Sequence, residues 1–411
     1  MTTAHHVHYD PTDRAVQADP YPLYHALREA DPMHWNPPGF WLLTRYEDVH
    51  TLLRDPRLGA DNGGNAGADA RPGGEHTERM AGGDTPSMIL MDPPGHTRLR
   101  ALVNKAFTPR AVEGLRERIE RIVDRLLDDW DSGPGSDSGS GGTDFVEAFA
   151  YPLPLDVICE MLGVPASDRA EVRDWSEDMA YLVDPVVTPE TVARGLSGRR
   201  KIIDYFRTLV AERRLAPGDD ILSGLILAED QGDRLTSDEL LATAALLVVA
   251  GHETTANMIA NGMLALLRHP DELELLRSSG PALVPAAVEE MLRYDGPAQA
   301  VGRRALEDIE LHGVRVPRGG RLVLSLGAAN RDPARFPDPD RLDITRPDNR
   351  HLALSGGAHF CVGAPLARME ACIAFTALLR RFPRLELTAE PRWRERTGLR
   401  GLRELRVGTG G

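Results

Sequence analysis

The chain has 411 residues, of which 42% are hydrophobic, enough to build the core of one large domain or of two to three ordinary ones. It carries 48 Lys and Arg residues against 62 Asp and Glu residues, so its formal net charge is −14. Because phosphate backbones select basic surfaces, this balance disfavours a general nucleic-acid role.

The cysteines and the apolar runs favour a cytoplasmic protein. Cys159, Cys361 and Cys372 form no CxxC pattern and indicate no disulfide framework. The N-terminus is polar and lacks the apolar centre of a secretory signal. The longest strongly apolar run, residues 240–251, is shorter than the ~20 residues that a membrane span needs. We therefore predict a reducing, cytoplasmic setting and no membrane association.

The predicted elements, taken in chain order, are mostly helices. A strand over 39–44 and a helix over 47–53 come first, and the strongly periodic helices follow. Two Gly-rich stretches, 62–86 and 132–143, are typical of loops. The main predicted helices are 111–130, 168–182, 189–214, 238–268, 283–294 and 364–379, with paired strands over 309–323. We predict an α+β fold that is mainly α, in one domain over residues 1–411 with 1–15 flexible.

The predicted helix over 238–268 is unusually long for a globular protein. Thr236 and Glu239 form a capping-box pattern at its start, and His269 followed by proline marks its end. Its middle is apolar nearly all round, which is typical of a helix that runs through the interior.

A cysteine flanked by glycines precedes the last predicted helix, in the segment SGGAHFCVGAP at 355–365. Glycines on both sides of Cys361 let the backbone fold tightly and approach a flat ligand closely. Pro365 suits the first turn of a helix, whose N–H groups and dipole favour thiolate over thiol. Such a thiolate is a good iron ligand. The alternative is a buried structural cysteine in a turn.

The longer segment LALSGGAHFCVGAPLAR resembles the haem-binding signature of the cytochrome P-450 family, Phe-Gly-x-Gly-x-His/Arg-x-Cys-x-Gly. Leu354 stands where the family has Phe, and Ser355 where it has the first Gly. The later positions of the pattern are kept by Gly357, His359, Cys361 and Gly363. The resemblance implies non-covalent haem b with its iron ligated by Cys361. It also implies a single triangular fold with a long central helix over the haem and small β-sheets at one side.

The segment AGHET, from Ala250 to Thr254, interrupts the long apolar helix. A glycine inside a helix costs ~1 kcal/mol relative to Ala, and buried polar groups need partners. The segment resembles the family's oxygen-activation motif, which implies that Gly251 makes room for dioxygen and that Glu253 and Thr254 relay protons. A helix kink with threonine back-bonding is the alternative. A His-Glu-x-x-His zinc site is excluded, because Ala256 occupies its second histidine position.

Glu290 and Arg293 lie three residues apart and share a helix face. Such pairs are usually surface salt bridges worth under ~1 kcal/mol. Here they resemble the family's Glu-x-x-Arg pair, and PDRL at 339–342 resembles its Pro-x-Arg-Phe element. The resemblance implies that Arg341 joins Glu290 and Arg293 in a buried structural network that holds the haem-binding region.

Haem carries two propionates, which need cationic partners. His96 and Arg100 resemble the family's distal His-x-x-x-Arg, and Arg303 matches another propionate-binding arginine. His359 is a fourth candidate. Each of them alone is typical of an ordinary surface residue, but together, in the family's order, they predict the propionate site.

The resemblance implies a monooxygenase that inserts one oxygen atom from O2 into a hydrophobic small molecule by hydroxylation or epoxidation. Its pocket is expected around residues 83–90, 180–187, 245–249, 297–301 and the turn near Thr397, with 62–86 as a lid or a loop without function. High use of Ala, Arg and Gly is typical of GC-rich, actinomycete-like genomes. Enzymes of this kind from such genomes often modify natural products such as polyketides or macrolides. Desaturation, aryl coupling and a non-catalytic haem sensor are the alternatives.

The expected partners are a ferredoxin and its reductase, which pass on electrons from NAD(P)H. An acidic enzyme would meet an acidic partner through a local basic patch. The basic candidates near Cys361 are Lys105, Arg110 and Arg368. We expect a monomer.

Overall fold

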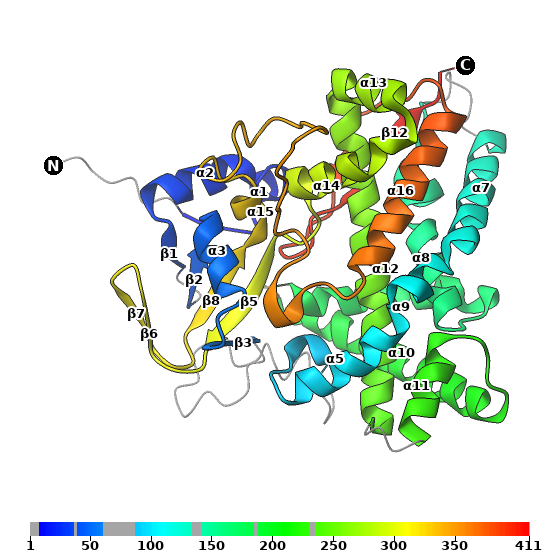
Figure 1. Cartoon of the computed structure of the whole chain (residues 1–411), viewed down its shortest axis with the longest axis horizontal. Helices are drawn as coiled ribbons and strands as arrows, with labels where there is room; N and C mark the ends of the chain where they lie inside the picture. Colours follow the sequence, from blue (N-terminus) through cyan, green and yellow to red (C-terminus); the bar gives the residue numbers. More distant parts are fainter. Residues whose placement is uncertain are drawn as a thin grey trace.

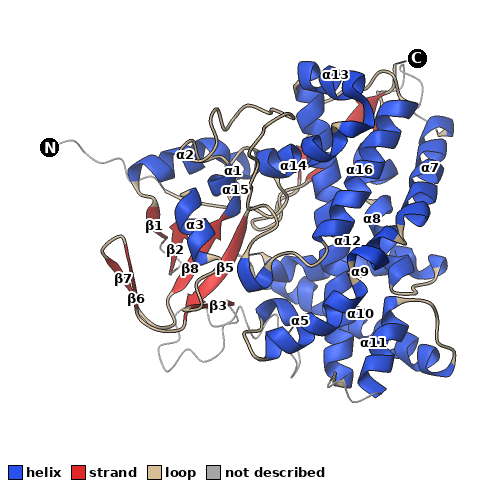
Figure 2. Cartoon of the chain, in the orientation of Figure 1, coloured by secondary structure: helices blue, strands red, loops and turns tan. Residues whose placement is uncertain are grey.

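Figures 1 and 2 show two regions side by side, a smaller one around a β-sheet and a larger one built from helices. The computed structural model describes residues 8–36, 39–60, 87–133, 141–184, 188–230 and 235–410. Helix α12 (Ser237–Arg268) runs through the helical region. This arrangement is the predicted α-rich α+β architecture.

The helices follow one another along most of the chain. They are α1 (Arg14–Ala18), α2 (Tyr21–Ala30), α3 (Tyr46–Leu52), α5 (Gly95–Ala106), α6 (Pro109–Glu113), α7 (Arg116–Ser132), α8 (Pro152–Met161), α9 (Arg169–Ala180), α10 (Pro189–Leu215), α11 (Ile221–Asp230), α12, α13 (Pro270–Ser279), α14 (Val284–Asp295), α15 (Leu326–Asn330) and α16 (Ala364–Arg381). The short helical turns η1 (Met88–Leu90) and η4 (Tyr181–Val183) belong to connections.

The largest sheet has the strand order β1-β2-β8-β5-β3. Its strands are β1 (Met33–Asn36), β2 (Phe40–Leu43), β8 (Arg321–Ser325), β5 (Ala300–Ala305) and β3 (Leu58–Ala60). Only the β2–β8 pair is parallel. Helices α3 and α15 pack beside this sheet.

Smaller strand pairs lie at other places in the fold. They are β6 (Ile309–Leu311) with β7 (Val314–Val316), β10 (Arg392–Trp393) with β11 (Leu402–Glu404), and β4 (Thr143–Asp144) with β12 (Arg406–Gly408) and β9 (Glu386–Leu387). The β6–β7 turn places His312 and Gly313 at positive φ, as a two-residue hairpin requires. The predicted strand pair around His312 and Gly313 is confirmed, whereas the strand after residues 317–320, β8, pairs with β2 and β5 in the largest sheet.

Helix α12 forms as its sequence predicts. The Thr236 hydroxyl accepts a hydrogen bond from the Glu239 N–H, and the Glu239 carboxylate accepts one from the Thr236 N–H, so the capping box is confirmed. The helix contacts α8, α9, α10, α14 and α16, and most of its side chains are buried. Burial on all sides is why its sequence is apolar all round.

Several predicted boundaries change in the structure. The helix expected over 111–130 is two helices, α6 and α7, separated at Gly114 and Leu115. Residues 8–15, which we expected to be flexible, include the buried Tyr9 and the start of α1. The rest of that segment and the predicted loop over 62–86 lie outside the described residues.

Among the described residues, no helix combines the length and apolarity that crossing a bilayer requires.

Candidate active site

The loop before α16 is held in a closed conformation by its own backbone. The Cys361 N–H donates a hydrogen bond to the Leu354 carbonyl, 3.0 Å away. Gly357 has φ +64°, and an added Cβ there would lie 2.3 Å from the carbonyl oxygen of Leu53, at the end of α3. Glycine is required at 357 by this close approach between two backbone segments.

Ser355 adopts φ +63°, the left-handed region that costs a residue with a Cβ about 1–2 kcal/mol. This conformation explains why the haem-binding signature that this segment resembles has glycine at the position of Ser355. We expect Ser355→Gly to raise the free energy of unfolding by about 1 kcal/mol, because the strain disappears. Denaturant unfolding measures the change. Ser355→Ala is the control, since it removes the hydroxyl but keeps the Cβ, and equal effects of both variants would contradict the prediction.

The sulfur of Cys361 faces the N-terminus of α16, where the backbone N–H groups of Gly363 and Ala364 hydrogen-bond to it. Burial raises the pKa of the Cys361 thiol, although these N–H groups and the charges of Arg100 and Arg368 oppose the increase. The expected contribution of the helix N-terminus is therefore present, because its N–H groups favour the thiolate, although desolvation is the larger effect on this thiol. A bound metal cation deprotonates a coordinating thiol outright.

Four basic side chains meet close to this loop. The rings of His96 and His359 have centroids 4.2 Å apart. Burial, and then the charges of Arg303, His96 and Arg100, lower the pKa of His359 to about 3. Within the described part of the chain, Nε2 of the buried His96 has no hydrogen-bond partner. The cluster predicted to bind propionates is thus brought together, and it concentrates positive charge.

The AGHET segment presents one exposed stripe in the middle of the buried helix α12. Ala250 is exposed and Thr254 half-buried, while their neighbours Val249 and Glu253 are buried. The Thr254 hydroxyl donates to the Ala250 carbonyl, 2.7 Å away, which is the back-bonding that we considered as the alternative.

The glycine of the segment packs against a neighbouring helix. A Cβ added at Gly251 would lie 3.0 Å from Cδ1 of Ile158 in α8, so the glycine permits a close helix crossing. Its role toward dioxygen stays a prediction.

The carboxylate of Glu253 takes part in a buried ion pair. Its Oε1 lies 3.1 Å from Nη1 of Arg396, and the same guanidinium pairs with Asp184 at 2.8 Å. Burial raises the pKa of Glu253, against the charges of Arg396 and Arg394. The protonated acid is therefore favoured more than in water, as a proton donor requires.

Glu290 and Arg293 form a fully buried bidentate pair with both nitrogen–oxygen distances at 2.8 Å. Arg293 also donates to the backbone carbonyls of Asn330, Pro339 and Arg341. The predicted network therefore exists and links α14 to the segment that leads to Cys361.

Arg341 was the wrong choice for the third side chain of this network. Its side chain is 66% exposed and only its carbonyl takes part. Arg346 occupies the place instead, with Nε 3.3 Å from both carboxylate oxygens of Glu290. The reason is a turn in which the Arg346 N–H donates to the Asp343 carbonyl, while the Asp343 N–H donates to Glu290.

Some of the segments predicted to line a substrate pocket lie together. Ala298 forms a β-bridge with Leu399, and the Gly398 N–H donates to Asp184, so three of the predicted segments meet at the turn around Thr397. The segment 245–249 is buried in α12, which η1 contacts. Residues 83–86 and 185–187 of the predicted lining lie outside the described residues.

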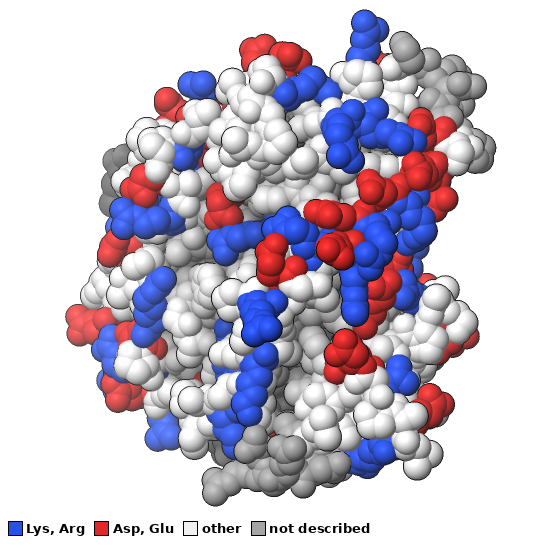
Figure 3. Space-filling model, turned by 45° about the vertical axis from the view of Figure 1, so that its right-hand side comes forward, with Lys and Arg blue, Asp and Glu red and all other residues white. Residues whose placement is uncertain are grey.

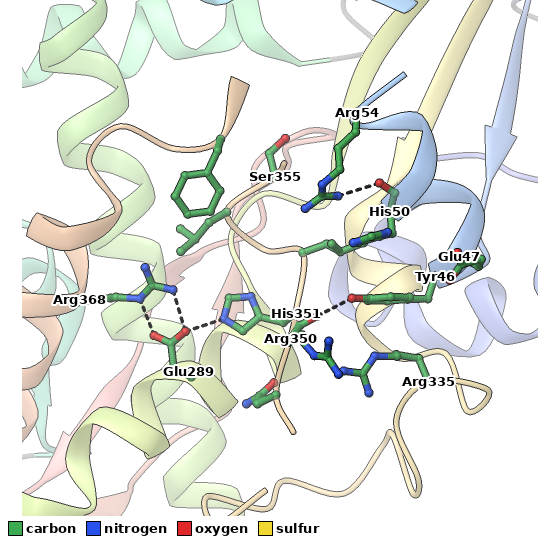
Figure 4. Close-up of a pocket in the computed structure, with 14 residues that line it drawn as sticks. Tyr46, Glu47, His50, Arg54, Glu289, Arg335, Arg350, His351, Ser355 and Arg368 are labelled. Carbon is green, nitrogen blue, oxygen red and sulfur yellow. Dashed lines mark hydrogen bonds and ion pairs between the residues drawn. The ribbon is translucent and has the colours of Figure 1, made fainter. Parts of the chain in front are cut away.

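On its other side the Cys361 loop borders an open pocket of about 510 Å³ (Figure 4). Arg368 donates two hydrogen bonds to Glu289, at 2.6 and 2.8 Å, and His351 lies 3.2 Å from the same carboxylate. Burial raises the pKa of Glu289, but the bonds from Arg368 and His351 outweigh it and lower that pKa to about 2. Arg368 is therefore already neutralised by a partner.

Comparison with known proteins decides the family. The family model for cytochrome P-450 matches residues 64–278 and 282–399. This chain belongs to the cytochrome P-450 family. It is a haem-thiolate monooxygenase, as members of this family are, and it needs redox partners to supply electrons.

Relatives of this cytochrome P-450 match almost end to end. The monooxygenase PikC of Streptomyces venezuelae is 43% identical over 95% of this chain and 91% of its own. The 6-deoxyerythronolide B hydroxylase of Saccharopolyspora erythraea is 39% identical over 96% of each chain. The solved structure of myxobacterial CYP267B1 in complex with myristic acid is 43% identical, covers 97% of this chain and 98% of its own, and has a TM-score of 0.87.

The residues present in this cytochrome P-450 fit a haem group. An added Cβ at Gly363 would have only the Cys361 sulfur within 4 Å, so the glycine leaves the space beside that sulfur open. The positive charges of Arg100 and Arg303, with the neutral rings of the two histidines as further hydrogen-bonding groups, suit the anionic propionates. The exposed stripe of α12 offers the small side chain of Ala250 and one hydroxyl.

Two functional side chains of this cytochrome P-450 were absent from the sequence-based predictions. Arg346 could have been found by testing each arginine after residue 339 as the third member of the Glu290 network. Arg396 has no comparable signal, because 143 residues separate it from Glu253 and 212 from Asp184.

Proposed function

We propose that this cytochrome P-450 oxidises a hydrophobic intermediate of natural-product biosynthesis, of the polyketide or macrolide type. The observation that carries the proposal lies in the middle of the buried helix α12. There the small apolar side chain of Ala250 is exposed and the hydroxyl-bearing side chain of Thr254 is half-buried. PikC and 6-deoxyerythronolide B hydroxylase support the substrate class, since their chains match this one over nearly their full lengths. Screening such molecules for a spin-state shift, then for hydroxylated or epoxidised product, tests the proposal.

The proposed roles follow from where the side chains lie. Cys361 holds the iron, while His96, Arg100, Arg303 and His359 hold the propionates. Bound haem supplies oxygen activation by one-electron steps.

The chain supplies the protons. The Thr254 hydroxyl, which donates to the Ala250 carbonyl in the structure, would turn to give its proton to the oxygen molecule as that molecule is reduced, and would then take a proton back from Glu253. Glu253, a buried acid next in sequence, is the source that replenishes it.

Thr254→Ala tests this relay. We expect product formed per NADPH consumed to fall by about 10-fold or more, because a positioned proton donor contributes at least that much to such steps. Oxygen and NADPH consumption should continue. The two rates, measured with a bound substrate, give the coupling.

Thr255→Ser is the matched control, since this neighbouring threonine is buried on another side of α12. Unchanged coupling in Thr254→Ala would reject the relay. A protein that binds haem but turns over no substrate in either form would instead favour the sensor alternative.

We propose that a ferredoxin with its reductase is the electron donor, in the cytoplasm, to a monomeric enzyme. Lys105 and Arg110 are exposed at the end of α5 and the start of α6. The Arg368 side chain is engaged by Glu289. Figure 3 shows a run of Lys and Arg side chains over the lower middle of one face, with few acidic groups within it. Such a surface suits an acidic partner.

Charge reversal tests this docking surface. In Lys105→Glu combined with Arg110→Glu, we expect the rate of reduction by ferredoxin to fall by about 10-fold at low salt and to lose most of its salt dependence. Stopped-flow absorbance measures it. Arg318→Glu, in the exposed turn between β7 and β8, is the control. An equal effect of the control would reject the surface.

A further inference from the structure

Arg396, in the turn that follows β10, joins two buried carboxylates that come from distant parts of the chain. Its Nε lies 2.8 Å from Asp184 Oδ2, and its Nη1 lies 3.1 Å from Glu253 Oε1. Its Nη2 donates to the Ala180 carbonyl at 2.7 Å, so its orientation is set from several sides.

The three charged side chains are almost entirely removed from solvent. The exposed fractions are 4% for Arg396, 5% for Asp184 and 1% for Glu253. Breaking such a pair on one side is costly, because the remaining charge stays buried. The arrangement therefore holds the Glu253 carboxyl group in one place.

Several charged groups surround Glu253. Arg394 and Arg396 lie close to it, Asp184 shares Arg396, and Glu177 lies between Arg394 and Arg173. Burial raises the pKa values of both Glu253 and Asp184. Within the described residues, Oε2 of Glu253 has no hydrogen-bond partner. Arg396 holds the other carboxylate oxygen, so Oε2 is available to carry a proton.

The cluster also touches the predicted substrate side of the molecule. Asp184 accepts a hydrogen bond from the Gly398 N–H, and the Gln299 N–H donates to the Gly398 carbonyl. The turn around Thr397 is thus tied to Asp184 through the backbone and through Arg396. Any molecule that shifts this turn shifts the guanidinium that holds Glu253.

We propose that Arg396, oriented by Asp184, is a positioning residue that fixes the Glu253 carboxyl group for proton transfer and couples it to the substrate-lining turn. This inference rests on the proposed role of Glu253 in the relay. The Glu253 carboxylic acid gives its proton toward the Thr254 hydroxyl and becomes a carboxylate. Arg396 stabilises that negative charge, and a proton from solvent water restores the acid.

The test compares Arg396→Gln, Arg396→Lys and Asp184→Asn in the haem-loaded enzyme, with Arg392→Gln as the matched control. Arg392 lies close by in β10, but its side chain is 65% exposed and its ion-pair partner is Glu404, at 3.4 Å. The measurements are product per NADPH, substrate affinity from the spin-state shift, and the infrared C=O stretch of the protonated Glu253. The band is assigned by its loss in Glu253→Gln.

We expect Arg396→Gln to lower the coupling by about 10-fold and to shift the infrared band, with unchanged haem content. Arg396→Lys should restore part of the coupling, since it keeps the charge but loses the planar fork. Asp184→Asn should shift the band in a protein that retains Arg396. Arg392→Gln should stay within about 2-fold of the wild type.

The inference would be overturned if Arg396→Gln kept wild-type coupling and an unshifted infrared band. If Arg396→Gln does not fold, the same result in both Arg396→Lys and Asp184→Asn would overturn it. Full coupling in Glu253→Gln would overturn the proposed relay itself. The two outcomes are distinguishable, because the first leaves Glu253 in place and tests how it is positioned, whereas the second removes its carboxylic acid.

Discussion

Cys361→Ala is expected to abolish the strongly red-shifted Soret band of the reduced protein under carbon monoxide. The band requires a thiolate ligand to the iron, which Cys361 would supply, and alanine has no ligand atom. In the structure two N–H groups of α16 point at the sulfur, which places it for ligation. An absorption spectrum of the purified protein, reduced with dithionite, measures the effect, which should be complete.

The other two cysteines provide the controls. Burial raises the pKa of Cys159 to about 12 and that of Cys372 to about 11, so both are held as thiols. Cys159→Ala and Cys372→Ala should therefore keep the band. A red-shifted band that survives in Cys361→Ala, or a wild-type spectrum typical of histidine ligation, would show that the iron ligand lies elsewhere.

Glu290→Gln is expected to destabilise the protein by about 3–5 kcal/mol, because it leaves the buried guanidinium of Arg293 without its counter-charge. The Arg346 guanidinium, 8% exposed, loses the same partner. The expected result is a large loss of folded, haem-loaded protein. Denaturant unfolding and the ratio of haem to protein absorbance measure it.

A pair of arginine variants distinguishes the structure from the sequence-based expectation. Arg346→Gln should lower the free energy of unfolding by about 2–4 kcal/mol, since it breaks a buried ion pair. Arg341→Gln should change it by about 0.5 kcal/mol or less, because the side chain is mostly exposed. The reverse order of effects would restore Arg341 to the network.

Much of the fold could be predicted from local patterns. The length of α12 and its start at the Thr236 cap follow from apolar periodicity and capping chemistry, both of which act within a few residues. The break between α6 and α7 was missed, because one glycine inside a periodic segment does not by itself distinguish an interruption from a continuous helix.

The site could be predicted as far as its residues lie within short motifs. Cys361, the AGHET segment and the Glu290–Arg293 pair each have fixed spacing, so the resemblance assigns them directly. The third arginine was misassigned because Arg341 and Arg346 lie in an irregular segment where spacing does not determine direction. The turn at Asp343 decides which side chain reaches Glu290.

The sequence by itself determined the family, the iron ligand to test and the segment predicted to face the oxygen chemistry, since these depend on residue types at close spacing. Only the tertiary structure decided that the Cys361 thiol is desolvated and that Arg396 holds Glu253. The physical reason is that desolvation and ion pairing depend on which distant side chains share a volume from which water is excluded. The separation of two residues along the sequence does not show whether their side chains lie close together in the fold.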